Sequence, residues 1–222
     1  MTKNTFIITA GGTGKRMQSH LPKQFIKING EVVLMRTLRT FHTFDPHGHI
    51  ILVLPEEERE RWKQICHQEQ YTLPHKVIAG GKTRFHSVQK GLSHAANQGI
   101  IAIHDGVRPL VSTDTIKEAI AAAQLHGAAI PSLELTDSIR ELTPGGSLPK
   151  NRERFRLVQT PQCFQAHLIK QAYRQEWQES FTDDASVAEA VGTKIFLTEG
   201  NRTNIKITHQ TDIALAELWW DQ

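Results

Sequence analysis

Residues 5–25 read TFIITAGGTGKRMQSHLPKQF, and this stretch contains the change of pattern that decides the fold. Phe6-Ile7-Ile8 is a continuous apolar run, which is typical of a strand buried on both faces of a parallel sheet. The run is followed by Gly11, Gly12 and Gly14. In an open α/β sheet the turn after the first strand is the usual phosphate site, because glycines let backbone N–H groups approach an anion closely. We therefore predict a strand that opens into an anion-binding turn.

The rest of the chain alternates short apolar runs with longer amphipathic stretches. Further strands are predicted at Ile50-Ile51-Leu52-Val53-Leu54, Val77-Ile78-Ala79, Ile100-Ile101-Ala102-Ile103 and Ala128-Ala129-Ile130. Helices are predicted over residues 32–44, 56–69, 85–97 and 113–126, the last with its apolar residues at helical spacing. This alternation predicts an α/β fold with a doubly wound, mostly parallel sheet and right-handed crossovers.

The alternation loosens between residues 134 and 159. A Pro144-Gly145-Gly146 turn signal lies there between two short runs, Ser138-Ile139-Arg140 and Phe155-Arg156-Leu157-Val158. This pattern predicts a β-hairpin arm that projects from the sheet. Strands are expected again at residues 194–197 and 205–208, before a helix over residues 212–220. With no internal repeat or low-complexity linker, residues 1–222 are predicted to form one domain with an arm.

Composition excludes several classes of protein. The chain has 222 residues, of which 39% are hydrophobic, so it can bury a core. Its net charge is +3 and it has no basic run, which disfavours nucleic-acid binding. No stretch approaches the roughly 18 to 20 apolar residues of a membrane span, and the first residues lack a signal-peptide pattern. We therefore expect a soluble, cytoplasmic protein, in which the distant Cys66 and Cys163 stay reduced.

Two familiar phosphate-binding motifs do not match the glycine turn. A Walker A loop needs a glycine where Thr9 stands and Ser or Thr where Arg16 stands. The dinucleotide fingerprint needs a small residue at Met17. What remains is a glycine loop followed by Arg16 and, after a turn restricted by Pro22, Lys23. Cations around backbone donors suit a triphosphate; the alternative is an ordinary β-turn with solvated basic residues.

A second candidate site element is the segment Ile103-His104-Asp105-Gly106-Val107-Arg108-Pro109. The apolar strand that ends in Asp105 brings this carboxylate to the same sheet edge as the glycine loop. There it can hold Mg²⁺ against phosphates, because Mg²⁺ takes one or two carboxylates and completes its shell with phosphate oxygens and water. Arg108 can bind a second phosphate in a bidentate manner. The alternative for Asp105 is a turn or helix cap, and His104 is interpreted as structural.

Two further segments carry charged residues. In Thr182-Asp183-Asp184-Ala185-Ser186, the spacing from Ser186 to Glu189 predicts a capping box at a helix start, which we favour over a paired-carboxylate metal site. This interpretation leaves Thr182 able to face a substrate. Lys206 is predicted to lie inside an apolar strand, so it is either exposed at an edge or directed at a negative group.

Taken in order, AGGTGKRMQSHLPKQF, GGKTRFHSV, HDGVRP, QTPQ, TDDAS and EGNRTNIKIT resemble the 2-C-methyl-D-erythritol 4-phosphate cytidylyltransferases, within the family of sugar-alcohol-phosphate cytidylyltransferases. The resemblance runs from about residue 5 to the last helix. It departs from the family pattern at Gly11 and at Gly106-Val107, where alanines are usual, and at Lys82, where an acidic residue is frequent. It implies a Rossmann-like nucleotidyltransferase fold, CTP as co-substrate, Mg²⁺ as cofactor and a homodimer that exchanges arms.

The resemblance also implies residue roles. CTP and its metal would be bound by Ala10, Gly11, Gly12, Gly14, Gly81, Lys82, Ser87, Asp105 and Gly106, with Asp105 positioning Mg²⁺. The triphosphate and the reacting α-phosphate would be neutralised by Arg16, Lys23 and Lys206. The acceptor would be bound by Asp105, Arg108, Thr182, Lys206 and, from the arm of a partner subunit, Arg152 and Thr160.

The implied reaction is attack by a phosphate monoester oxygen on the α-phosphorus of CTP, with pyrophosphate leaving in line. The nucleophile is largely dianionic at neutral pH and needs no general base. This agrees with a sequence that supplies cations and a carboxylate but no candidate Ser-His-Asp or Cys-His set. Two alternatives stay open: a D-ribitol 5-phosphate cytidylyltransferase with the same fold and metal, and a non-catalytic regulator that binds CTP.

Overall fold

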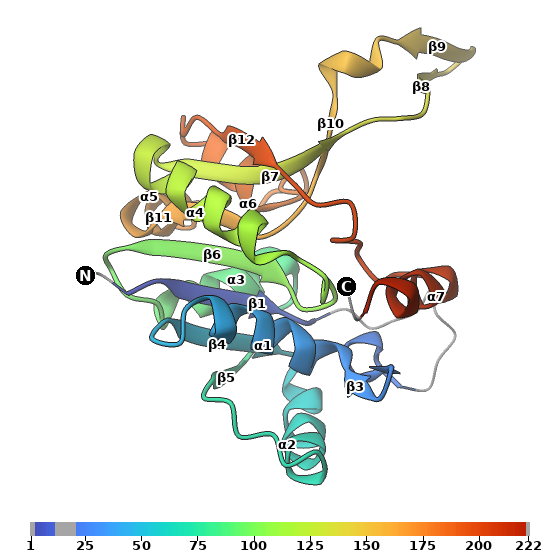
Figure 1. The fold of residues 1–222 in the computed structure, drawn as a ribbon. Helices are drawn as coiled ribbons and strands as arrows, with labels where there is room; N and C mark the ends of the chain where they lie inside the picture. Colours follow the sequence, from blue (N-terminus) through green and yellow to red (C-terminus); the bar gives the residue numbers. More distant parts are fainter. Residues whose placement is uncertain (1–2, 12–20, 221–222) are drawn as a thin grey trace.

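A central sheet covered by helices forms the body of the molecule (Figure 1). The computed structural model describes residues 3–11 and 21–220. The strands of the central sheet are β1 (Thr5–Thr9), β4 (His49–Leu54), β5 (Lys76–Ala79), β6 (Ile100–Asp105), β7 (Ala128–Glu134), β10 (Arg156–Val158), β11 (Gln162–Gln165) and β12 (Phe196–Glu199). The helices are α1 (Val33–Phe44), α2 (Arg59–Gln68), α3 (Arg84–Ser93), α4 (Thr113–His126), α5 (Ala166–Ala172), α6 (Asp184–Glu189) and α7 (Gln210–Trp219). Short 3-10 turns are η2 (Lys23–Phe25), η3 (Glu56–Glu58) and η4 (Arg152–Arg154).

The order of the strands confirms the doubly wound, mostly parallel prediction. The sheet runs β10-β7-β11-β6-β1-β4-β5, with β12 paired to β7. β1 is parallel to both β4 and β6, β4 is parallel to β5, and β12 is parallel to β7, whereas β10 and β11 are antiparallel to their neighbours. The chain winds outward from β1 to β4 and β5, and then returns to add β6 on the other side. Such a reversal opens a crevice at the carboxyl ends of the two strands between which it occurs.

Alternate residues of each strand enter different layers of the core. Phe6 and Ile8 of β1 pack in the cluster that also takes apolar residues of α1, α2 and α4. Ile7 points to the opposite face, in the cluster with residues of α3, α5 and α6. Because both faces are covered, the strands need apolar residues at successive positions. The continuous run at the start of the chain is therefore explained by the two helical layers.

The helix boundaries follow local signals where these are strong. The Ser112 side chain accepts a hydrogen bond from the Thr115 N–H at the start of α4, and Gly127 ends the helix with φ 92°. This helix spans the predicted residues 113–126. The helix predicted over residues 85–97 is wrong at its end, because α3 stops at Ser93. Beyond Leu92 the segment adds little apolar surface to bury, and Gly99 turns the chain into β6 with φ 85°.

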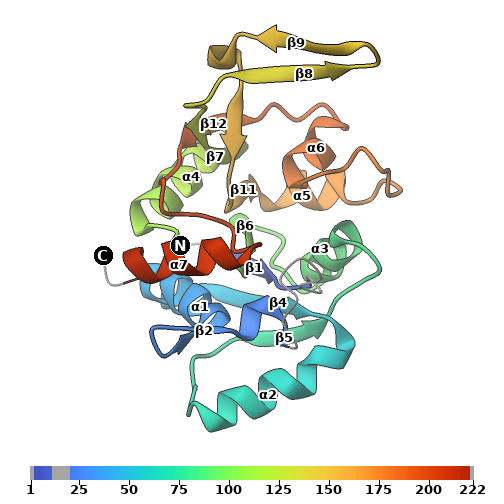
Figure 2. The same cartoon turned by 90° about the vertical axis from the view of Figure 1, so that its right-hand side faces the viewer.

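The arm, which we define as residues 134–159, contains a tighter hairpin than predicted. β8 (Ile139–Thr143) and β9 (Gly146–Lys150) pair on either side of the Pro144-Gly145 turn. The run at residues 155–158 is not a leg of this hairpin, because β10 pairs with the distal end of β7. The hairpin consequently extends beyond the sheet and stands away from it, as Figures 1 and 2 both show.

The prediction of a strand over residues 205–208 is wrong. After β12 the chain crosses from the edge of the sheet to the loop that follows β6, where the N–H of Ile207 donates to the carbonyl of Val107 at 2.9 Å. That loop offers no extended partner, so no ladder forms. Ile207 is buried with Val107 and the α7 residue Ala216 in a small separate cluster. Lys206 therefore lies on a loop; we call residues 200–208 the Lys206 loop.

The described residues contain neither a membrane-spanning helix nor a disulfide bond. None of their helices combines the length and the apolar composition that crossing a bilayer requires. Cys66 and Cys163 are both free thiols. Burial raises the pKa of the Cys66 thiol to about 11 and that of Cys163 higher still. Both therefore remain protonated packing residues at neutral pH.

Candidate active site

The ends of β1 and β6 are held together at the crevice where the strand order reverses. Thr9 is the register partner of Asp105, and the N–H of Gly106 donates to the carbonyl of Thr9 at 2.8 Å. A Cβ added to Gly106 would lie 3.0 Å from the Cβ of Ala10. The lack of a side chain at Gly106 thus lets the two strand ends approach closely. Ala10, Gly11, Asp105 and Gly106, all predicted site residues, lie together here.

Asp105 is surrounded by three cationic side chains. Its Oδ2 is 3.0 Å from Nζ of Lys206 and 3.2 Å from Nε of Arg108, and its Oδ1 is 3.9 Å from Nε of Arg84. Burial by itself would raise the pKa of this carboxyl group, but Arg84, Lys206 and Arg108 outweigh that effect and hold the pKa well below its usual range. Asp105 is therefore ionised, and the site holds more positive than negative charge.

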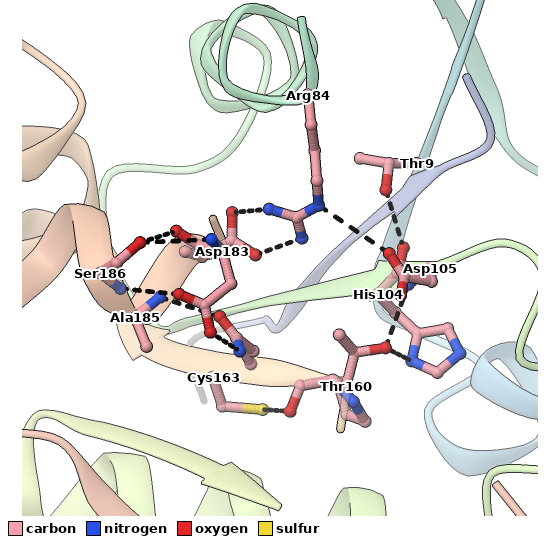
Figure 3. A network of polar contacts seen from close by, with 12 residues as sticks. Thr9, Arg84, His104, Asp105, Thr160, Cys163, Asp183, Ala185 and Ser186 are labelled. Carbon is pink, nitrogen blue, oxygen red and sulfur yellow. Dashed lines mark hydrogen bonds and ion pairs between the residues drawn. The ribbon is translucent and has the colours of Figure 1, made fainter. Parts of the chain in front are cut away.

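Arg84 is a site residue that sequence reasoning missed. Its guanidinium makes a bidentate pair with Asp184, at 2.9 and 2.6 Å, and Figure 3 shows it reaching from α3 to the vicinity of Asp105 as well. Burial opposes the charge of Arg84, but Asp184 and Asp105 raise its pKa above the usual value. Asp184 also accepts a 2.5 Å hydrogen bond from the hydroxyl of Tyr173. The only sequence signal was that Arg84 and Asp184 each lie in one of the matched motifs.

The start of α6 confirms the predicted helix but not the predicted cap. Asp183 is the N-cap residue and Ser186 occupies the third helical position, so the capping box joins these two residues, not Ser186 and Glu189. Asp183 is fixed further because Gln162 donates to its Oδ2 at 2.8 Å. An aspartate caps a helix as well as a serine does, and here it comes first in the chain. Thr182 lies just before the cap and is exposed.

His104 and Thr160 form a buried support behind Asp105. The hydroxyl of Thr160 lies 3.0 Å from Nδ1 of His104 and accepts from the N–H of Asp105 at 3.2 Å. The other ring nitrogen of His104 is 3.1 Å from the carbonyl of Arg108. Burial lowers the pKa of His104 to about 4, so the neutral ring is structural, as its sequence context suggested. Thr160 is buried against its own chain's Asp105 and lies outside the arm.

The turn between β5 and α3 contains three more predicted residues. The Oγ of Ser87 accepts from the N–H of Gly81 and donates to the carbonyl of Thr83, both at 3.0 Å. A Cβ on Gly81 would lie 2.4 Å from the Cβ of His86, so this position requires glycine. Lys82 is exposed. Ser87 therefore shapes the turn, and Lys82 projects from it.

Lys23 is connected to the end of β1 by its neighbour. It begins η2 directly after Pro22. Gln24, which is buried, donates from Nε2 to the carbonyl of Ala10 at 3.0 Å. Phe25 stacks on the ring of Trp62 with centroids 6.0 Å apart. Gly12, Gly14 and Arg16 lie outside the described residues.

Arg152 is the predicted site residue that its own chain does not bring to Asp105. It lies in η4 of the arm, is exposed, and donates from Nη1 to the carbonyl of Thr136 within the arm. The β8–β9 hairpin of the arm stands away from the sheet in both views (Figures 1 and 2).

The donor set around Asp105 fits a metal that binds mainly to its substrate. Within residues 3–11 and 21–220, no group of three or more His, Cys, Asp or Glu side chains forms a cage for an ion. Of the two oxygens of Asp105, Oδ2 is occupied by Lys206 and Arg108, whereas Oδ1 has one ion pair at 3.9 Å. Mg²⁺ commonly takes one or two carboxylates together with phosphate oxygens. The site therefore fits Mg²⁺ only when a polyphosphate accompanies the ion.

Comparisons with known proteins match nearly the whole chain to one family. Residues 5–222 match the family model described as 2-C-methyl-D-erythritol 4-phosphate cytidylyltransferase. A protein of that name from Bacteroides fragilis is 49% identical over 212 residues, covering 96% of this chain and 97% of the relative. A protein of the same name from Phocaeicola vulgatus is 47% identical over 212 residues, with the same coverage.

Solved structures of proteins from the same family have the same fold as this chain. The 4-diphosphocytidyl-2C-methyl-D-erythritol synthase of Anaerococcus prevotii superposes with a TM-score of 0.83 at 30% identity, covering 99% of this chain and 96% of that one. The 2-C-methyl-D-erythritol 4-phosphate cytidylyltransferase of Thermus thermophilus superposes with a TM-score of 0.81 at 30% identity over the full length of both chains.

Proposed function

We infer the reaction from the premise that this chain belongs to the 2-C-methyl-D-erythritol 4-phosphate cytidylyltransferase family. It is a nucleotidyltransferase that transfers the cytidylyl group of CTP to 2-C-methyl-D-erythritol 4-phosphate. The products are 4-diphosphocytidyl-2-C-methyl-D-erythritol and pyrophosphate, in the non-mevalonate pathway to isoprenoid precursors. The observation in the structure that best supports this reaction is the group of three cations around Asp105 at the crevice.

The chemistry brings two anions together. The attacking phosphate monoester needs no general base, so the work of the protein is to orient the phosphates and to offset their repulsion. Lys206 is suited to this role because its side chain is 42% exposed while its Nζ stays 3.0 Å from Asp105. We assign Lys206, Lys23 and Arg16 to the triphosphate and the reacting α-phosphate.

The remaining residues are assigned by the motifs in which they lie. Ala10, Gly11, Gly12 and Gly14, at and after the end of β1, are assigned to the triphosphate together with Gly106. Gly81, Lys82 and Ser87 of the β5–α3 turn hold the nucleoside. Arg108 and Thr182 are assigned to the acceptor, and Arg108 is pre-oriented for this role because it contacts both Asp105 and the carbonyl of Asn204.

Mg²⁺ is the proposed cofactor, and Asp105 is the residue that would hold it, through Oδ1. When bound, the ion supplies positive charge that draws the triphosphate and the incoming phosphate into line. Asp105 in turn is kept ionised and in place by Arg84, Lys206 and Arg108. These residues would position the carboxylate before any ligand arrives.

We further propose that residues 1–222 form one domain that dimerises through its arm. The arm exposes large apolar side chains, with Leu142 86% and Leu148 54% exposed. A hairpin with so little core is stabilised by covering this surface, and a second copy of the chain would do so while bringing Arg152 to the partner's site. A sedimentation mass near that of one chain, 25.1 kDa, would contradict this assembly.

A cytoplasmic location is part of the same proposal, because the substrates are multiply charged phosphates.

Pyrophosphate release tests the function directly. Purified protein is given CTP and Mg²⁺ with either 2-C-methyl-D-erythritol 4-phosphate or D-ribitol 5-phosphate, in parallel. Release with the first acceptor alone is the expected outcome. Preference for ribitol phosphate would keep the reaction type and change the acceptor, whereas no release with either acceptor would favour a CTP-binding regulator. EDTA should abolish the release, and added Mg²⁺ should restore it.

A further inference from the structure

The arm returns to the sheet through a residue that supports the active site from behind. β10 pairs with β7 and leads directly into Gln159, whose N–H donates to the carbonyl of Pro131 at 2.9 Å. Gln159 is buried, and so is the following residue, Thr160, which contacts His104 and the N–H of Asp105. Gln159, at the root of the arm, and Thr160, which supports Asp105 at the floor of the site, are therefore adjacent in the chain.

The carboxamide of Gln159 is bonded to the Lys206 loop. Its Nε2 donates to the carbonyl of Asn201 at 3.0 Å and, more weakly, to the carbonyl of Asn204 at 3.4 Å. Its Oε1 accepts from Nδ2 of Asn204 at 3.3 Å. One buried side chain thus bonds to both ends of the segment that leads to Lys206.

The same loop also holds Arg108. The carbonyl of Asn204 accepts from Nη1 of Arg108 at 2.8 Å, and Nδ2 of Asn204 donates to the carbonyl of Thr160 at 2.9 Å. Two of the three cations at Asp105 therefore depend on the path of this loop. Lys206 lies two residues beyond Asn204, and Arg108 is hydrogen-bonded to it.

The loop approaches Gln159 so closely that a side chain at residue 200 would have to displace the carboxamide of Gln159. A Cβ added to Gly200 would lie 2.4 Å from Oε1 of Gln159. The fold does not depend on this contact alone, because the N–H of Gly200 donates to Ser132 and the N–H of Ile207 donates to Val107, both at 2.9 Å. The contact with Gln159 thus adds a restraint on the loop to backbone bonds that already attach it to the protein.

We propose that Gln159 is a positioning residue, through which the root of the arm sets the places of Lys206 and Arg108 at Asp105. This inference rests on the roles assigned to those two cations in the proposed function. Gln159 touches no substrate in this scheme. It acts because the Lys206 loop can move by small amounts, and misplacing a reacting group by about 1 Å costs up to 10²-fold in rate.

Gln159→Met tests the inference, with Gln165→Met as the matched control. Methionine keeps the length of the side chain and removes its hydrogen bonds. Gln165 also donates to two backbone carbonyls, those of Gln124 at 3.0 Å and Ala123 at 3.4 Å, but it is the last residue of β11, whereas Gln159 precedes this strand. We expect kcat to fall about tenfold or more in Gln159→Met and to stay within about threefold in Gln165→Met, with a similar loss of thermal stability in both. Equal kcat values in the two variants would overturn the inference.

A double mutant separates positioning from a general structural effect. If Gln159 acts through Lys206, then Gln159→Met should cost much less in a Lys206→Ala background than in the wild type. Losses that multiply would show that Gln159 acts elsewhere. If Lys206→Ala alone has wild-type turnover, the assigned role of Lys206 fails, and this inference fails with it; retained pyrophosphate release would still support the reaction.

Gly200→Ala tests the same contact by changing the other residue that forms it. The added methyl group displaces the carboxamide of Gln159, which is the far end of a flexible side chain, so the chain should still fold. We expect a loss of kcat in the same direction as for Gln159→Met and no further loss when the two are combined. A full additional loss in the double variant would contradict a shared route through Gln159.

Discussion

The active-site floor and the arm depart from the usual distribution of side chains in opposite ways. At the floor, Asp105 and Asp184 are buried charges surrounded by Arg84, Arg108 and Lys206. On the arm, large apolar side chains are exposed over a two-stranded hairpin. A buried charge and an exposed apolar patch are the informative exceptions in a soluble protein. The comparison teaches that each region is unbalanced by itself: one has excess positive charge, which we assign to phosphates, and the other has uncovered apolar surface, which we assign to a second copy of the chain.

Breaking the buried charge network should have the largest effect on stability. Arg84→Ala leaves the buried Asp184 without its bidentate partner, and among the described residues only Tyr173 still donates to its carboxylate. Removing one partner of a buried ion pair costs about 3 to 5 kcal/mol of unfolding free energy. Urea unfolding monitored by circular dichroism measures the loss. Arg59→Ala is the control, because its pair with Glu56 is exposed and should contribute less than about 1 kcal/mol. Similar losses in the two variants would contradict a special role for the Arg84–Asp184 pair.

Removing a cation that we assign to the phosphates should lower turnover with little effect on folding. We expect Lys206→Ala, and likewise Lys23→Ala, to reduce kcat by about 10² or more, the effect of losing one preorganised charge-stabilising group. Initial rates of pyrophosphate release measure this effect. Lys76→Ala provides a control, because this exposed lysine lies at the start of β5, 2.9 Å from Nδ1 of the exposed His94 and at the other end of the strand from the crevice. Either site variant with a kcat within about threefold of the wild type would lose its assigned role.

Mixing two inactive variants tests whether the two regions meet between subunits. Lys206→Ala lacks a cation in its own site, and Arg152→Ala lacks the arginine that its arm would lend. In a mixed dimer one site has both residues, so random exchange should restore about a quarter of wild-type activity. If Arg152 serves its own subunit, no mixed site is complete and the mixture should stay inactive. Subunit exchange is verified by tagging one variant and co-purifying the other.

Alanine at the two glycines that depart from the family pattern should have the smallest effects. A Cβ at Gly106 meets Ala10 and Leu34, each at 3.0 Å, so Gly106→Ala should cost about 1 kcal/mol through overpacking. Among residues 3–11 and 21–220, no atom lies within 4 Å of a Cβ placed at Gly11, so Gly11→Ala should change stability by less than about 0.5 kcal/mol. Thermal unfolding of the two variants measures the difference. A larger loss for Gly11→Ala would contradict the packing observed at the ends of β1 and β6.

Local patterns were sufficient for most of the framework. The continuous apolar runs predicted β1, β4, β5, β6 and β7 because helices cover both faces of the sheet, and the spacing in residues 113–126 predicted α4. The sequence failed where a segment's partner is distant. Residues 205–208 look like a strand but meet only a loop, and residues 155–158 pair with β7 rather than completing the hairpin.

The sequence by itself therefore determined the layered α/β fold and the carboxylate at the end of β6, because each depends on residues that are neighbours in the chain. The tertiary structure alone decided which charged and polar groups meet. Arg84 and Asp184 are 100 residues apart, and Gln159 and Asn204 are 45 residues apart. No periodicity links such pairs; they come together only when crossovers bring separate strand ends to one edge of the sheet, where buried polar groups must find partners.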